Sequence, residues 1–285
     1  MPRWTVESPT TLDFDHVAAL RVRAISGSVA VLSTDNRPCL AIDDIAGQPL
    51  LVSHDDGVLT ISYEDLTWDG LLGWLRPQRH SATITVTVPA SCPVQLGVVN
   101  AGAVVSGIAA PTSVKSVSGK VTLEGVTGTV DAATVSADVE AQGVAGKIGF
   151  NSVSGDLTLA DGSLGRLDAK TVSGRVTADI DLDSTGRLNI GTVSGPVTIR
   201  LPSQASTRVS LRSAAGRVQS EFPDLHTGHQ PGAFIRSGQL GTGGFGQVCV
   251  TTMSGPITLL RRSDPAAAHP GAGPGAGPGP EGAQR

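Results

Sequence analysis

Aromatic side chains are scarce in this sequence: they make up 3% of its 285 residues, although 39% of the residues are hydrophobic. A large globular core usually includes several aromatic rings, because each ring buries more surface than an aliphatic side chain. The shortage therefore predicts a narrow interior lined by valine, alanine, leucine and isoleucine.

Cysteine and clustered charge are also lacking. The three cysteines, Cys39, Cys92 and Cys249, are odd in number and far apart, which argues against a disulfide framework and against a cysteine metal site. The formal net charge is −4, and Lys and Arg are scattered along the sequence. Nucleic acid is therefore not expected as a partner, since phosphate binding needs a basic stripe.

Long apolar runs are missing as well. No stretch of about 18 apolar residues is present, so no transmembrane segment is expected. The opening residues MPRWTVESPT contain no apolar core of a signal peptide. We therefore expect a cytoplasmic protein, with peripheral association with the cell envelope as an alternative.

What the sequence has instead is a repeat of the type TVSG-x-VT. Seven copies begin at Ser116, Thr134, Ser152, Thr171, Thr192, Ser213 and Thr252. Successive starting positions differ by 18, 18, 19, 21, 21 and 39 residues. A period of this size is typical of a solenoid, in which each unit is too small to bury its own apolar face and stacks on the next.

Apolar residues recur at fixed offsets within the repeat, and we expect them to form vertical files along the stack. The first file contains Val117, Val135, Val153, Val172 and Val193, and the second contains Val121, Val139, Leu157, Val176, Val197 and Val218. Further files contain Leu123, Ala141, Leu159, Ala178 and Ile199, then Val130, Ile148, Leu167, Leu188 and Val209, and finally Ala132, Phe150, Ala169, Ile190 and Leu211. Spacings of two are those of strands with one face inward.

Two glycine turns divide each unit into two strands, one after the Ser-Gly pair and one after pairs such as Thr127-Gly128. Glycine provides the positive φ of a tight corner, and the neighbouring Ser or Thr can bond to the local backbone. The prediction is an all-β fold, a parallel β-solenoid or β-helix with two-strand coils of roughly 18–21 residues. Its handedness and cross-section are left open.

The predicted organisation has three parts. Residues 1–90 form an N-terminal β-region or cap with a short helical insertion near 64–78, residues 91–261 form the solenoid, and residues 262–285 form a disordered Pro/Gly/Ala tail. Within the first part, Asp56-Gly57 predicts a hairpin. The strands of residues 1–62 are either imperfect first coils or an antiparallel cap.

The predicted insertion is the one segment with a helical pattern of apolar residues. Trp68, Leu71, Leu72 and Leu75 follow at i, i+3, i+4 and i+7, and Trp74 lies beside them. One interpretation is an amphipathic helix packed against the solenoid. The other is a docking patch for a protein or a lipid surface, which exposed Trp side chains suit. These five residues are the predicted binding residues.

Searches for catalytic patterns give no catalytic, cofactor-binding or metal-binding residue. Asp179, Asp181 and Asp183 form the densest acidic cluster and are interpreted as a surface loop rather than a weak cation site. The glycine pattern of Gly241–Gly246 is interpreted as a hairpin turn, because no helix follows it. His226 and His229 have no third ligand nearby in the sequence. No cofactor is predicted.

The TVSG-x-VT units, the preceding strand TITVTVP and the closing LGTGGFGQVCVTTMSGPITLL together resemble a bacterial family of β-strand-repeat adhesin candidates, the DUF4097 type, which is related to toast-rack proteins. The likeness covers roughly residues 12–260. It implies a β-helical superstructure without catalytic residues, and roles in adhesion or in envelope-stress regulation.

The predicted function is a non-enzymatic structural or binding scaffold for protein–protein interaction, linked to the cell envelope or to adhesion. Its partner would be a protein or an envelope component. Solenoid ends and edges are natural templates for pairing, which favours homotypic association as well. Two alternatives stay open: a degenerate carbohydrate-active β-helix enzyme of the polysaccharide lyase or hydrolase type, and an adhesin exported by an unusual route.

Overall fold

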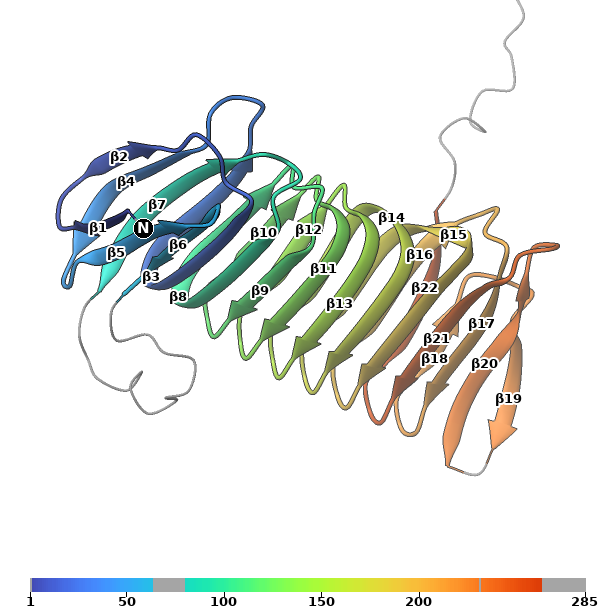
Figure 1. Cartoon of the computed structure of the whole chain (residues 1–285). Helices are drawn as coiled ribbons and strands as arrows, with labels where there is room; N and C mark the ends of the chain where they lie inside the picture. Colours follow the sequence, from blue (N-terminus) through green and yellow to red (C-terminus); the bar gives the residue numbers. More distant parts are fainter. Residues whose placement is uncertain (1, 64–79, 231, 263–285) are drawn as a thin grey trace, which may run out of the picture.

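A computed structural model describes residues 2–63, 80–230 and 232–262. Its regular elements are 22 β-strands, and none of the described residues is helical. The predicted helical insertion near 64–78, with Trp68, Leu71, Leu72, Trp74 and Leu75, lies outside the described residues, and so does nearly all of the predicted tail. Figure 1 shows the strands stacked side by side as a long two-layered body. The prediction of an all-β fold with parallel stacked strands is therefore confirmed.

Each coil contributes one strand to each of two layers. Across the first layer the strands follow in the order β2 (Thr10–Asp13), β4 (Cys39–Ala46), β7 (Ser81–Val88), β3 (Ala19–Ser33), β8 (Val94–Ser106), β10 (Val121–Glu124), β12 (Val139–Gln142), β14 (Leu157–Thr171), β15 (Val176–Thr192), β16 (Val197–Pro202), β22 (Ile257–Arg262) and β18 (Val218–Ser220).

The second layer has the order β1 (Arg3–Val6), β5 (Leu50–Asp55), β6 (Val58–Ser62), β3, β8, β9 (Thr112–Ser116), β11 (Thr127–Thr134), β13 (Ala145–Ser152), β14, β15, β21 (Gly246–Thr252), β17 (Thr207–Ser213), β20 (Ala233–Leu240) and β19 (His226–Gln230). Four long strands, β3, β8, β14 and β15, run from one layer into the other and tie the layers together.

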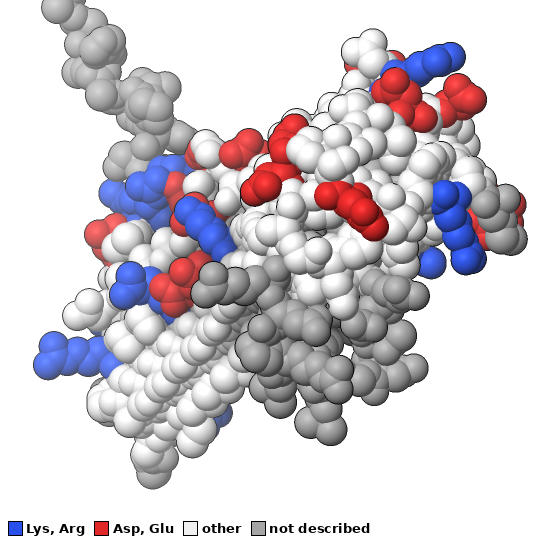
Figure 2. Space-filling view, turned by 90° about the vertical axis from the view of Figure 1, so that its left-hand side faces the viewer, with Lys and Arg blue, Asp and Glu red and all other residues white. Residues whose placement is uncertain are grey.

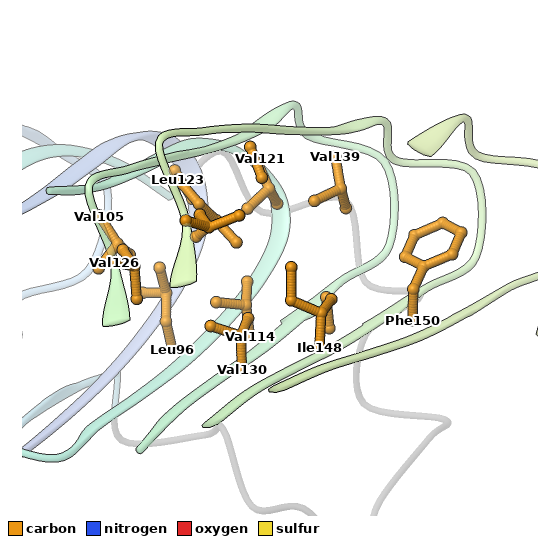
Figure 3. Close-up of a cluster of buried hydrophobic side chains, with 14 of the residues drawn as sticks. Leu96, Val105, Val114, Val121, Leu123, Val126, Val130, Val139, Ile148 and Phe150 are labelled. Atoms are coloured by element: carbon orange, nitrogen blue, oxygen red, sulfur yellow. The ribbon is translucent and has the colours of Figure 1, made fainter. Parts of the chain in front are cut away.

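The core lies between the two layers. The file that starts at Val121 is in register, since Val121 pairs with Val139, Val139 with Leu157, Leu157 with Val176 and Val176 with Val197. All five are buried. Figure 3 shows Val121 and Val139 from the first layer pointing toward Val130, Ile148 and Phe150 of the second. Burial of each such side chain stabilises the fold by roughly 1.5–3 kcal/mol.

The order of coils at the C-terminal end departs from the order of the sequence. The last repeat, β21 and β22, lies between the coil of β15 and β16 and the coil of β17 and β18. Val197 therefore pairs with Ile257, and Ile257 in turn pairs with Val218, so Val197 and Val218 are not neighbours. The expectation that successive repeats contact each other directly is wrong at this point. The spacing of 39 residues reflects the antiparallel strands β19 and β20, which the chain builds before it returns.

The N-terminal region contains both structures that the sequence left open. β3 is a coil, because it pairs in parallel with β8 along both layers. β1, β2, β4 and β5 instead pair antiparallel and lie at the outer end of the stack. The predicted hairpin is confirmed, with positive φ at Asp56 and Gly57 between β5 and β6. Antiparallel edges at an end of the stack hinder addition of further parallel coils.

Candidate functional site: an exposed apolar ridge

Corners of the type Ser/Thr-Val-Ser-Gly follow the second-layer strands of the repeat, with Ala137 in place of the glycine in one copy and Ala214 and Ala215 in place of Val and Ser in another. In five of the seven copies the hydroxyl oxygen of the first residue accepts the backbone N–H of the glycine three residues later. These distances are 3.0 Å from Gly174 N to Thr171 Oγ1 and 2.9 Å from Gly195 N to Thr192 Oγ1. The expected local bond to the backbone is therefore formed by the first residue of the corner and not by the serine next to the glycine.

The serine of each corner binds it to the coil beneath. The Ser136 hydroxyl donates to the Val117 carbonyl at 3.0 Å, and the Ser154 hydroxyl donates to the Val135 carbonyl at 3.3 Å. Ser173, Ser194 and Ser254 make the same bond at 3.3–3.4 Å. Because each coil is bonded to its neighbour at the same place, the corners stand in a straight column.

Between these two residues the apolar side chain of each corner points outward. The residues in this position are Val117, Val135, Val153, Val172, Val193 and Met253, which we call the corner ridge. The fractional exposures from Val135 onward are 49, 51, 48, 42 and 62%. Backbone bonds from Val172 N to Val153 O and from Val193 N to Val172 O, both 3.2 Å, hold them side by side. Figure 2 shows the lower edge of the stack as uncharged ridges running in parallel.

The outward direction of this file corrects an expectation from the sequence. Val135 and Val139 are four residues apart, so in one continuous strand both would face inward. The corner at Ser136 and Ala137 separates them, and the alternation of inward and outward side chains starts again after it. Val139 is consequently buried while Val135 is half exposed. In the other repeats the Ser-Gly pair marks this corner, and at the same position here the sequence has Ser136-Ala137.

Glycine is needed at this corner for a different reason from the one expected. Gly155, Gly174 and Gly195 do not have a positive φ. A Cβ atom on Gly174 would instead lie 2.0 Å from the carbonyl oxygen of Gly155 in the coil beneath. Gly27, which follows Ser26 in β3, does have a positive φ of 99°, and in the opposite turn Gly128 and Gly146 have φ values of 101° and 113°. The expectation of positive φ is thus wrong for the corners at Gly155, Gly174 and Gly195, and right for Gly27 and for these two residues of the opposite turn.

The predicted acidic cluster lies within strand β15 and not in the loop that was expected, and two of its three carboxylates pair with arginine. Asp179 bonds to the guanidinium groups of Arg200 and Arg262, and Asp181 also bonds to Arg262. The Arg200 hydrogen bond is the main cause that holds the pKa of Asp179 below its usual value, against the opposing effect of burial, and the charges of Arg200 and Arg262 add to it. These carboxylates therefore serve to join β15, β16 and β22.

Two carboxylates on adjacent coils also have structural bonds. Asp138 accepts the backbone N–H of Asp156 at 2.9 Å, and Asp156 accepts the backbone N–H of Arg175 at 2.7 Å. Asp138 follows the corner at Ser136 and Ala137, and Asp156 follows the corner at Ser154 and Gly155. Each carboxylate oxygen thus bonds to a backbone N–H of the next coil. Within residues 2–63, 80–230 and 232–262, no group of three or more His, Cys, Asp or Glu side chains is placed to hold a metal ion.

The remaining sequence candidates lie apart from the ridge. Gly241–Gly246 connects β20 to β21, which lie on either side of β17, so this loop crosses a strand and is not the hairpin that was expected. Both His226 and His229 belong to β19, at the end of the second layer. In the part of the chain that the structure describes, no helix is long and apolar enough to cross a membrane.

The three cysteines are free thiols on different strands or turns. Burial raises the pKa of the Cys92 thiol to about 11, and it raises the pKa of Cys39, with smaller contributions from Asp13. Thiolates are the reactive form of cysteine. Neither Cys39 nor Cys92 thus has the lowered pKa of a catalytic nucleophile.

Comparison with known proteins gives one match to a family and several distant structures. The family model described as Toastrack DUF4097 matches residues 47–260, which is most of the chain. No curated protein matches the sequence significantly.

The similar solved structures are distant in sequence. A "putative adhesin" from Bacteroides fragilis is 12% identical, covers 90% of this chain and 99% of its own, and has a TM-score of 0.40. A "putative lipid binding protein" from Parabacteroides distasonis is 10% identical, with coverages of 90% and 98% and a TM-score of 0.39. A "putative cell adhesion protein" from Clostridium sporogenes is 11% identical, with coverages of 90% and 100% and a TM-score of 0.32. These values are too low for the names of those proteins to describe this chain.

Proposed function

The chain belongs to the Toastrack DUF4097 family, and we propose that it is a non-enzymatic binding scaffold that docks a protein partner along the corner ridge. The observation that carries the proposal is the column of half-exposed apolar side chains from Val135 to Val193, continued by Met253. Contiguous exposed apolar surface with a polar rim is the usual character of a protein-binding site. The serines beside each valine provide such a rim.

The rigidity of the corner column supports the same proposal. Val135, Val172 and Val193 are held by backbone bonds to the coils on both sides, and serine hydroxyls bind the carbonyls of Val135, Val172 and Val193. A partner that binds such a surface orders few side chains, since valine has one rotatable side-chain bond. Preorganised surfaces lose less entropy on binding than mobile ones.

A second docking element remains part of the proposal, with the cell envelope as its setting. The segment with Trp68, Leu71, Leu72, Trp74 and Leu75 has the aromatic and aliphatic composition of an anchor. Because these residues lie outside the described ranges, their part in docking is argued from the sequence alone. The resemblance to bacterial adhesin candidates is what suggests the envelope.

The test is affinity capture from the native cell with four forms of the full chain. The forms are the unchanged protein, Val153→Lys with Val172→Lys on the ridge, Thr158→Lys with Gln219→Lys as a matched control on the outer face of the first layer, and a variant lacking residues 64–79. We expect the ridge variant to lose a specific partner at least tenfold while the control retains it. Sedimentation velocity on the same forms measures whether that partner is a second copy of the chain.

Equal capture by the ridge variant and the control would contradict docking along the ridge. Loss of the partner only in the variant lacking residues 64–79 would show that this segment, and not the corner ridge, binds the partner. All four substituted positions are exposed, so we expect unchanged melting temperatures, and a large drop in one variant would show a role in packing instead.

A further inference from the structure

The outer face of the second layer is strongly basic, although the whole chain has a net charge of −4. The cations lie on the outward positions of β13, β14, β15 and β17, and β21 lies among them. We call the following six residues the basic face: Lys147, Arg166, Lys170, Arg187, Arg208 and Arg212. All six are exposed.

Strand register assembles the basic face from distant parts of the sequence. Lys147 pairs with Arg166, and Arg166 pairs with Arg187. Gln247 of β21 then separates Arg187 from Arg208. Neighbouring strands are about 4.8 Å apart, so this row extends about 19 Å across the strands.

A second, shorter row lies four residues further along the same strands. It consists of Lys170 and Arg212, with Gly191 and Thr251 between them. Four residues of strand correspond to about 13 Å. The six cations are therefore spread over two dimensions of a flat sheet, and they are not gathered into a groove or a single line.

Few carboxylates compensate these charges. Asp168 lies between the two rows, where it forms an ion pair with Arg166 and accepts a bond from Asn189 Nδ2 at 3.0 Å. Asp131 lies two strands away from Asp168, across Gly149, and Asp183 borders the face beside Gly165. Among the described residues, no carboxylate is within ion-pair distance of the other five cations.

The opposite layer shows that this arrangement is specific to one face. On the outside of the first layer the charges have mixed sign, and Lys120 pairs with Glu140 at 2.8 Å while Arg200 pairs with Asp179. The charge of the molecule is thus polarised between its two broad faces.

We propose that the basic face binds the surface of a bilayer that contains anionic phospholipids. Six exposed cations on a flat sheet are complementary to a plane of lipid phosphates. Each Lys or Arg near such a surface increases the partition coefficient about fivefold. This inference goes beyond the proposed docking of a protein, because it rests on a different face and on charge.

The composition of the face favours a membrane surface over two other classes of partner. The outward positions between the cations carry Gly149, Asn189, Gly191, Cys249 and Ser210. They lack the large apolar or aromatic residues found at the centre of protein interfaces. A single linear polyanion, such as a nucleic acid strand, would contact one row and leave the other unused, whereas a bilayer contacts both.

The experiment is cosedimentation of the full chain with vesicles of phosphatidylcholine alone and of phosphatidylcholine mixed with phosphatidylglycerol. We expect binding only to the anionic vesicles, with at least a tenfold loss in high salt because exposed charges are screened. Arg187→Glu with Arg208→Glu should reduce the partition at least tenfold. The matched control, Arg175→Glu with Arg217→Glu, makes the same change in net charge at the corners directly before β15 and β18 and should reduce the partition less than threefold.

Equal losses in the two double variants would overturn the proposal, since net charge and not the basic face would then decide binding. Absence of binding to anionic vesicles would overturn it as well. Binding of single-stranded DNA or heparin that is lost in Arg187→Glu with Arg208→Glu, without any vesicle binding, would assign the face to a linear polyanion. The Val153→Lys and Val172→Lys variant should still bind vesicles, which separates this test from that of the ridge.

Discussion

Val176 illustrates how much one inward residue contributes. It is fully buried between Leu157 and Val197, its partners in the neighbouring coils. Val176→Asp places a carboxyl group where no partner is available, and we expect the free energy of unfolding to fall by at least about 3 kcal/mol. Arg175→Gln changes the adjacent, exposed residue and should alter it by less than about 0.5 kcal/mol. Urea unfolding of the two variants measures both values, and equal losses would mean that inward and outward positions are misassigned.

Asp179 should give the fold a dependence on acid pH. Its pKa is lowered in the folded state, chiefly by the Arg200 hydrogen bond, so the stabilisation is present above the unfolded pKa of about 3.9. It is lost as the pH falls through the folded pKa, that is, below about pH 4. We expect unfolding between pH 7 and pH 3 to show a steeper loss for the unchanged protein than for Asp179→Asn. Parallel pH profiles would argue against this ion pair as a source of stability.

Among the elements, the Ser-Gly corner is the one most repeated, and one copy of it differs. Ala137 occupies the position of the corner glycine, and there the Thr134 hydroxyl donates to Ser152 Oγ at 2.9 Å, not to a bond within its own corner. The corner thus has one form that accepts a methyl group, at Ala137, and a second form at Gly174 that leaves no room for one.

This difference predicts unequal effects of two small substitutions. Gly174→Ala places a methyl group about where the Gly155 carbonyl lies, 2.0 Å away, and should lower stability by about 1–3 kcal/mol. Ala137→Gly should be close to neutral. Thermal unfolding followed by circular dichroism compares them. A silent Gly174→Ala would mean that every corner can adopt the form found at Ala137.

The coil of β21 and β22 is the element whose position is least local. It lies between coils that precede it in the sequence, with Val248 and Val250 paired to both neighbours. A chain that ends before Gly246 would leave β15 and β17 without their common partner. We expect such a chain to lose the coil of β17 and β18 cooperatively, which hydrogen exchange would reveal as rapid exchange in 207–220. Protection retained there would mean that β17 can pair directly with β15.

At the scale of the whole molecule, stability should decrease from the middle toward the ends. A solenoid is held mainly by contacts between neighbouring coils, so its end strands have a partner on one side only. We expect the slowest amide exchange in the first-layer strands β12, β14 and β15, and faster exchange in β1 and β19. Native-state hydrogen exchange resolved by peptide measures this order. Uniform protection along the stack would indicate a single cooperative unit.

The two faces and the corner give the whole molecule three distinct surfaces. The first layer carries paired charges of both signs, the second carries the basic face, and the corner between a second-layer strand and the next first-layer strand carries the apolar ridge. A body of this kind can hold a protein along one edge while one broad face lies on an anionic surface. Separate variants of each surface make the two activities distinguishable.

The sequence by itself determined the repeat, the two strands of each coil and the inward files from Val121 and Val130, because these depend on spacing and on the alternation of side chains along a strand. Tertiary structure decided the rest. The position of β21 and β22 depends on which strand edges of the earlier coils are still without a partner when the chain returns. The outward direction of the Val135 side chain depends on a corner after which the alternation of inward and outward side chains starts again. Cations as far apart as Lys147 and Arg208 come together only through register between strands, and spacing along a single chain does not contain that register.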